Sequence, residues 1–174
     1  IDPQTDADMW VMPMTGDRKP SVIAKTPFRE VWPVFSPDGR WMAYQSNESG
    51  RPEIYIRAFV APGETGAKAP GGQWQVSTSG GIMPAWRSDG KELYYLDPAG
   101  AMMAAPITVT ASAIEPGGPM KLFPTRIFGG GVDAQEGPQY SVAPDGRFLI
   151  NTELDVADAP ITLLMNWNPA AQKR

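Results

Sequence analysis

Histidine and cysteine are both absent from the 174 residues of this chain. Without histidine there is no imidazole to act as a general base or a metal ligand, and a Ser-His-Asp triad is excluded. Without cysteine there is no disulfide, no thiolate nucleophile and no cysteine-based zinc site. We therefore expect a protein that is not an enzyme and that uses no cofactor and no metal.

Excess positive charge and long apolar runs are also missing. The chain has 15 Lys and Arg against 19 Asp and Glu, a net charge of −4. Phosphate binding needs a basic face, so we expect no nucleic-acid partner. No segment reaches 18 consecutive apolar residues, so we expect no direct membrane insertion. The chain begins at Ile1 inside a polar stretch, which we interpret as a piece of a longer or processed precursor.

The chain is rich in turn-forming residues, with 19 Pro and 18 Gly, and a motif recurs among them. Each copy has an apolar run, an Asp-Gly turn and a second apolar run. The three copies are residues 33–46 (PVFSPDGRWMAYQS), 84–97 (PAWRSDGKELYYLD) and 138–152 (PQYSVAPDGRFLINT). A repeat of about fifty residues indicates a solenoid or a propeller.

The Asp-Gly turns explain why each copy forms a hairpin. Pro37 presets φ for the first turn position, Asp38 suits the second, and Gly39 can take the positive φ that reverses the chain. The equivalent aspartates are Asp89 and Asp145. We interpret all three aspartates as turn formers and not as catalytic groups.

Further apolar segments follow each hairpin and also precede the first. They are 8–14, 21–26, 53–59, 74–78, 101–108, 121–127 and 161–167. The pattern predicts an all-β fold, a β-propeller of four-stranded antiparallel blades, here an incomplete arc of about three and a half blades. The predicted units are a half blade (1–28), two blades (29–79 and 80–128) and a three-stranded blade (129–168).

The strand composition indicates that the sheets are covered on both faces. In 41–46 (WMAYQS) and 92–96 (ELYYL) neighbouring positions are both apolar, whereas a sheet with one wet face would alternate. Blades stacked between their neighbours have this property. Trp41 and Trp86 are accordingly expected in the core.

The repeat resembles the TolB-like, WD-like propeller repeat of bacteria. The resemblance rests on the F-S-P-D-G-R-x-x-A-Y core at 35–44 and the Ile-Tyr pair that follows at 54–55, and it covers about residues 6–168. The order of D-x-W-x-x-P (8–13), 35–55, WQVSTSGG (74–81) and PITLLMNW (160–167) is similar to the C-terminal end of propellers attached to bacterial Ser/Thr protein kinases.

This resemblance implies an extracytoplasmic or periplasmic sensor that recognises a protein, a peptide or a small ligand. Any kinase activity would belong to another part of the parent, because no kinase motif occurs here. Two alternatives stay open. The chain could be the propeller accessory domain of a prolyl-oligopeptidase-like hydrolase, or a TolB-like periplasmic scaffold that only docks proteins.

The connections between blades are the expected ligand-binding positions, because they crowd around the mouth of the central channel. Trp32 precedes the first strand of a unit, beside Arg29 and Glu30. The equivalent connections hold Ile82 and Met83, then Gln135, Glu136 and Gln139. An aromatic residue with adjacent charges suits a binding mouth, and ordinary packing is the alternative.

Two further expectations concern a cation and an assembly. Asp2, Asp6 and Asp8 could offer oxygen ligands to Ca²⁺, although their spacing is not that of an EF-hand and a capping or solvated role is the alternative. An incomplete arc leaves two apolar faces uncovered. We expect a homodimer that closes a ring, or missing blades supplied by the parent chain.

Overall fold

The computed structural model describes residues 6–62, 72–110, 113–127 and 137–152, and within these ranges the fold is all-β. No helix of the length and apolarity needed to cross a membrane occurs in those ranges. The strands are β1 (Met9–Val11), β2 (Ser21–Ala24), β3 (Glu30–Phe35), β4 (Trp41–Ser46), β5 (Glu53–Ala58), β6 (Gln73–Gln75), β7 (Ile82–Trp86), β8 (Glu92–Leu96), β9 (Ala101–Val109), β10 (Ile114–Pro116), β11 (Met120–Pro124), β12 (Tyr140–Val142) and β13 (Phe148–Ile150).

These strands form four separate antiparallel sheets. β1 pairs with β2, β3 to β6 pair in sequence order, and β12 pairs with β13. In the remaining sheet β7, β8 and β9 pair in order, and β10 and β11 both pair with β9. The described strands form no closed barrel, because no sheet pairs its first strand with its last.

Within the described residues, the predicted hairpins and the strands that flank them are confirmed. β10 was not predicted, and it pairs with the last three residues of a long β9, beyond the part that pairs with β11. The predicted strand at 161–167 lies outside the described residues.

The Asp-Gly turns have the predicted conformation. Gly39, Gly90 and Gly146 have φ values of 70°, 72° and 86°, which glycine adopts without a steric cost. The turns also lie next to one another. A Cβ on Gly90 would lie 3.7 Å from Pro37 Cδ, and Ser88 Oγ donates a 2.9 Å hydrogen bond to the carbonyl of Pro144. Equivalent turns of successive units therefore form a row.

The sheets pack face to face, and β4 shows how. Its alternate residues Met42 and Tyr44 belong to a core cluster shared with β1 and β2, whereas Trp41 and Ala43 belong to a cluster shared with β8 and β9. Every residue of β4 is buried. The sequence expectation that both faces of this sheet are covered is therefore confirmed.

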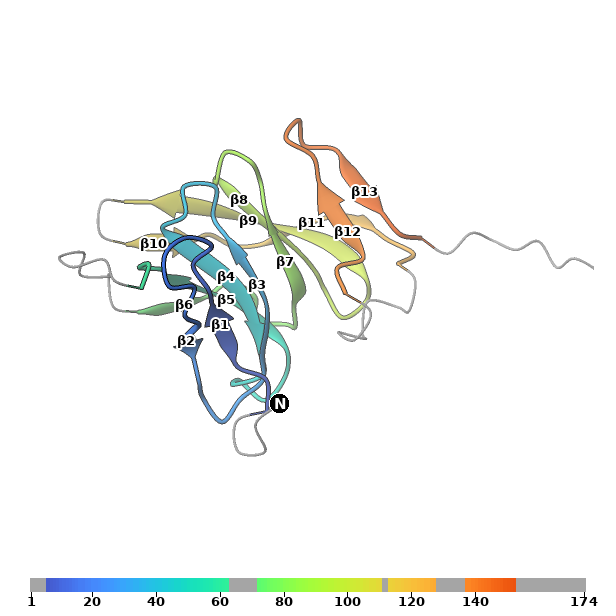
Figure 1. Ribbon diagram of the computed structural model, residues 1–174. Coiled ribbons are helices and arrows are strands. Elements are labelled where there is room, and N and C mark those ends of the chain that lie inside the picture. The colour runs from blue at the N-terminus through green and yellow to red at the C-terminus, as the bar shows by residue number, and fades with distance from the viewer. Residues whose placement is uncertain (1–5, 63–71, 111–112, 128–136, 153–174) are drawn as a thin grey trace, which may run out of the picture.

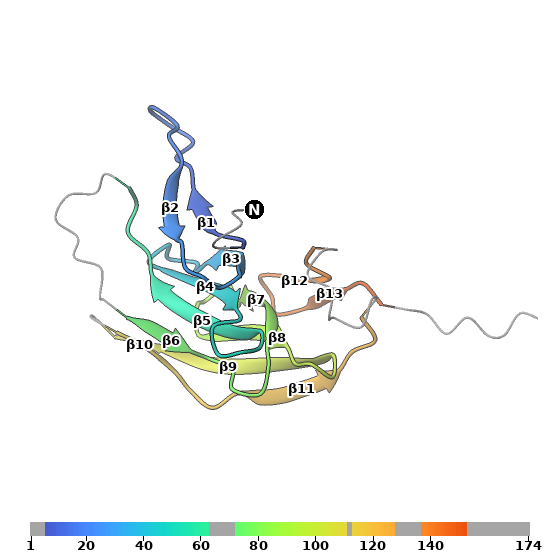
Figure 2. The same ribbon diagram turned by 90° about the horizontal axis from the view of Figure 1, so that it is seen from below.

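A third cluster joins the β7–β11 sheet to the β12–β13 hairpin, and it includes Met83, Tyr94 and Tyr140. The two-stranded sheets β1–β2 and β12–β13 thus lie at opposite ends of the stack, as Figures 1 and 2 show from two directions. Each end sheet has one face on the core. On the other face Trp10 is 58% exposed at one end, and Leu149 is 76% exposed at the other.

Candidate functional site

A proline interrupts the first strand of each of the two larger sheets, β3 to β6 and β7 to β11. Pro33 and Pro84 have no N–H to donate to a ladder, and the pairing register shifts around them, between Val31 and Val34 and between Ile82 and Ala85. A bulge of this kind bends the strand and redirects the adjacent side chain.

The residues that precede these prolines have left-handed backbone conformations. Trp32 has φ of 56° and Met83 has φ of 54°. For a residue with a Cβ this region costs roughly 1–2 kcal/mol, and such strain clusters at binding and active sites. The same strained position therefore recurs in two successive units.

These bulges line one pocket of about 150 Å³. Its walls come from the first strands β3, β7 and β12 and from Pro138, two residues before β12, and all of its lining residues are apolar or aromatic. They are Trp32, Pro33, Val34, Met83, Pro84, Ala85, Pro138 and Tyr140. Sites for small molecules start at about 300 Å³, so this pocket holds a single side chain at most.

Cross-sheet contacts fix the pocket walls. The hydroxyl of Tyr140 donates a 2.6 Å hydrogen bond to the carbonyl of Met83, and Trp86 Nε1 donates a 3.3 Å bond to the carbonyl of Val34. Burial raises the pKa of Tyr140, so its hydroxyl keeps its proton. The ring of Trp32 extends toward the segment that leads into β12. A Cβ at Gly137 would lie 4.0 Å from this ring. Its Nε1 is buried and meets no acceptor among the described residues.

The structure brings together part of the predicted binding set. Trp32 and Met83 line the pocket, and the half-buried Ile82 packs against the neighbouring core cluster. Gln139 is buried between two lining residues, but its amide is engaged by Asn151 Nδ2 at 2.8 Å and by the carbonyl of Gly137 at 3.2 Å. The predicted Gln135 and Glu136 lie outside the described residues.

Arg29 and Glu30 are not among the residues that line this pocket. Glu30 is 3% exposed, its carboxylate accepts a hydrogen bond from the hydroxyl of Thr26, and its backbone N–H donates to Ala7 at 2.9 Å. Burial, with the nearby charges of Asp8 and Glu48, raises the pKa of Glu30. The backbone N–H of Arg29 donates to Asn47 Oδ1 at 2.9 Å.

The acidic residues near the N-terminus give no metal site in the described part of the chain. Asp2 lies outside it, and no group of three or more potential metal ligands occurs within it. The pocket residues that sequence reasoning missed are the three prolines, Val34, Ala85 and Tyr140. The repeated Trp-Pro and Met-Pro pairs before the two hairpins were a signal for the bulges.

No family model matches this chain, and no curated protein matches it either. Among solved structures, TolB from Acinetobacter baumannii is similar with a TM-score of 0.44 and 16% sequence identity. The match covers 81% of this chain and 42% of that one, so the chain spans less than half of the length of TolB.

Proposed function

We propose that this chain is a non-catalytic binding module that recognises a protein or peptide through one apolar side chain. The observation that carries the proposal is the shared pocket of Trp32 and Met83, two residues held in left-handed conformations at equivalent positions. Strain of this kind persists only where the surrounding structure imposes it, and it is expected at a site that presents side chains to a partner.

The pocket's size and chemistry favour a peptide over a substrate. A volume of about 150 Å³ suits one apolar side chain anchored from a larger partner. The only lining residue with a titratable side chain is Tyr140, whose hydroxyl is bonded to the carbonyl of Met83. The whole sequence has no histidine or cysteine to supply a base or a thiolate.

The four stacked sheets are best interpreted as blades of a propeller. The row of equivalent turns and the coverage of β4 on both faces support this interpretation. The exposed Trp10 and Leu149 at the two ends support the packing of further sheets there, from a second copy or from the rest of the parent chain.

The wider context of the proposal rests on the sequence resemblance. It favours the extracytoplasmic sensor end of a bacterial Ser/Thr kinase, with a hydrolase accessory domain and a periplasmic docking scaffold as alternatives. The coding sequence of the parent would separate these three. It would encode a kinase domain and a membrane helix, a hydrolase domain, or a signal peptide followed by a propeller alone.

Peptide display against the purified chain tests the binding function directly. We expect enriched peptides to share one apolar anchor residue. Trp32→Gly should weaken their binding at least tenfold, as loss of an aromatic anchor contact does. The control is Trp10→Ala, because Trp10 is 58% exposed on an end sheet and does not line the pocket. Binders that tolerate Trp32→Gly as well as Trp10→Ala would contradict the proposal.

A further inference from the structure

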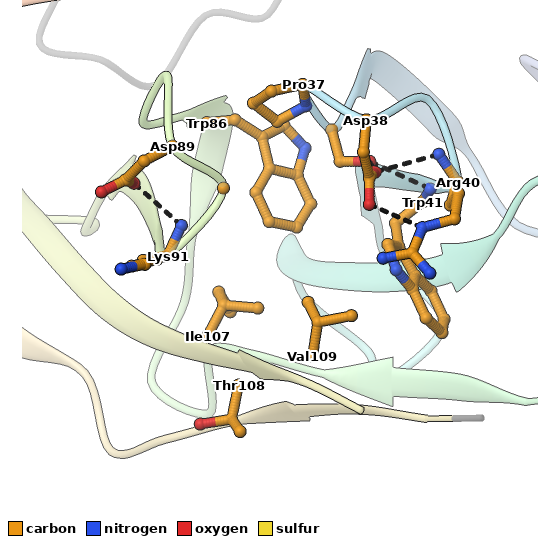
Figure 3. Close-up of a pocket in the computed structure, with 12 residues that line it drawn as sticks. Pro37, Asp38, Arg40, Trp41, Trp86, Asp89, Lys91, Ile107, Thr108 and Val109 are labelled. Atoms are coloured by element: carbon orange, nitrogen blue, oxygen red, sulfur yellow. Dashed lines mark hydrogen bonds and ion pairs between the residues drawn. The ribbon is translucent and has the colours of Figure 1, made fainter. Parts of the chain in front are cut away.

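A second and larger pocket lies behind the row of Asp-Gly turns, between the β3–β6 and β7–β11 sheets (Figure 3). Its volume is about 450 Å³, which falls within the range of small-molecule sites, about 300–1,000 Å³. The lining residues come from two successive turns and from the end of β9. They are Ser36, Pro37, Asp38, Arg40, Trp41, Trp86, Asp89, Gly90, Lys91, Ile107, Thr108 and Val109.

The interior of this turn pocket is apolar. Ile107 and Val109 form its floor, the indole of Trp86 stands over them, and Trp41 lies to one side beside Arg40 (Figure 3). The floor exists because β9 continues past the end of its pairing with β8, and β10 supports this extension. Trp86 is half-buried, not fully buried as expected for a core residue, so part of its ring is available to a ligand.

The two aspartates of the pocket are already committed to their own turns. Asp38 accepts hydrogen bonds from Ser36 Oγ at 2.6 Å, from the backbone N–H of Arg40 at 3.1 Å and from Arg40 Nε at 2.7 Å. Burial acts to raise the pKa of Asp38, but these bonds outweigh it and hold the pKa below its usual value. Asp89 accepts from the backbone N–H of Lys91 at 3.0 Å and pairs with Arg87 Nε at 3.6 Å.

The cations of the pocket keep free donors. Arg40 uses only Nε for Asp38, and its terminal nitrogens have no acceptor among the described residues. The Lys91 ammonium likewise has no ion-pair partner within the described ranges. Figure 3 shows the Arg40 guanidinium beside the Trp41 indole on one wall of the pocket. The polar groups of the pocket that remain free to bind a ligand are therefore hydrogen-bond donors.

We propose that the turn pocket binds a carboxylate that carries an apolar or aromatic body. The body lies on Ile107 and Val109 against Trp86, and the carboxylate pairs with the terminal nitrogens of Arg40, a geometry that guanidinium favours. Such a ligand has two sources, a free small acid and the C-terminal carboxylate of a peptide. This site is separate from the pocket that Trp32 and Met83 line, so it goes beyond the function proposed above.

The test is a titration with 3-phenylpropanoate and with its uncharged amide, followed by the indole N–H signals of Trp41 and Trp86 in NMR. We expect saturable shifts with the acid and at least tenfold weaker binding of the amide, the effect of one charge-assisted hydrogen bond. Arg40→Gln should remove this preference. The matched control is Arg147→Gln, the equivalent arginine of the third Asp-Gly turn, which does not line the pocket.

A second pair of ligands distinguishes the two sources. A hexapeptide that ends in a free phenylalanine carboxylate should bind more tightly than 3-phenylpropanoate if the site takes peptide termini, and less tightly if it takes free acids. Val109→Trp fills the pocket and should abolish binding of either ligand, with the fold checked by circular dichroism. Equal binding of acid and amide, no saturable shift at millimolar acid, or equal effects of Arg40→Gln and Arg147→Gln would each overturn the proposal.

Discussion

The Tyr140 hydroxyl, on the first strand of the last hairpin, donates a 2.6 Å hydrogen bond to the carbonyl of Met83, on the first strand of the preceding sheet. Tyr140 is 7% exposed and Met83 is 3% exposed. A bond in this setting fixes the spacing between two sheets and also holds the strained Met83 backbone. The pocket that Trp32 and Met83 line therefore depends on a contact between two sheets, not on either hairpin alone.

Tyr140→Phe should lower the free energy of unfolding by about 1.5 kcal/mol, because the buried carbonyl of Met83 loses its side-chain donor. Urea unfolding measures the change. Tyr95→Phe is the control, because Tyr95 is also buried but its hydroxyl has no hydrogen-bond partner among the described residues. This variant should change the free energy of unfolding by less than about 0.5 kcal/mol. Equal losses in the two variants would contradict the role of the Tyr140 bond.

Trp32→Gly should be more stable than Trp32→Ala by about 1 kcal/mol, because glycine adopts the left-handed region without the steric cost that alanine incurs. The neighbouring Val31 provides the reverse control, since it has no positive φ. There glycine should be the less stable of the two substitutions. Thermal unfolding of the four variants measures both differences, and an alanine advantage at position 32 would show that the strand is extended there.

Glu30→Gln should change how stability depends on pH. Burial and the charges of Asp8 and Glu48 outweigh Thr26 and Arg57 and raise the folded-state pKa of Glu30 above its unfolded value of about 4.5. The folded chain then keeps a proton that the unfolded chain has lost, so stability contributed by this group falls as pH rises through that window. Relative to the natural chain, the glutamine variant should gain stability as the pH rises above 4.5, the unfolded-state pKa of Glu30. Parallel stability profiles of the two proteins against pH would contradict this.

Glu53→Ala should be one of the more damaging substitutions, at about 3 kcal/mol. The Glu53 side chain is fully buried and accepts hydrogen bonds from the Ser77 hydroxyl, from the backbone N–H of Gly80 at 2.9 Å and from Arg51 Nε at 2.8 Å. Its loss leaves two buried donors unpaired. Glu115→Ala, at an exposed position of β10, is the control and should be nearly neutral in urea unfolding.

The hairpins and the buried sheets were predictable because their causes are local. The Asp38-Gly39 turn and its equivalents require positive φ at glycine, and the continuous apolar character of 41–46 requires two covered faces. β10 was not predictable, because its three residues include a proline and a glutamate, and it forms only where a long β9 offers a free edge.

The candidate sites were predictable in part. The position of Trp32 and Met83 followed from the repeat, but their left-handed conformations depend on bulges around Pro33 and Pro84 that are set by pairing with the next strand. The turn pocket was not predictable, because no single Asp-Gly turn contains it. Only the stacking of two sheets places one turn beside the next.

Methyl NOEs from β4 test the stacked arrangement most directly. The account predicts that the methyl group of Met42 shows NOEs to β1 and β2, for example to Met9 and Ala24. The methyl group of the adjacent Ala43 should instead show NOEs to Leu93 and Ala105 of the β7–β11 sheet. NOEs from both methyl groups to the same neighbouring sheet, or from Met42 to no other sheet, would contradict sheets that are each covered on both faces.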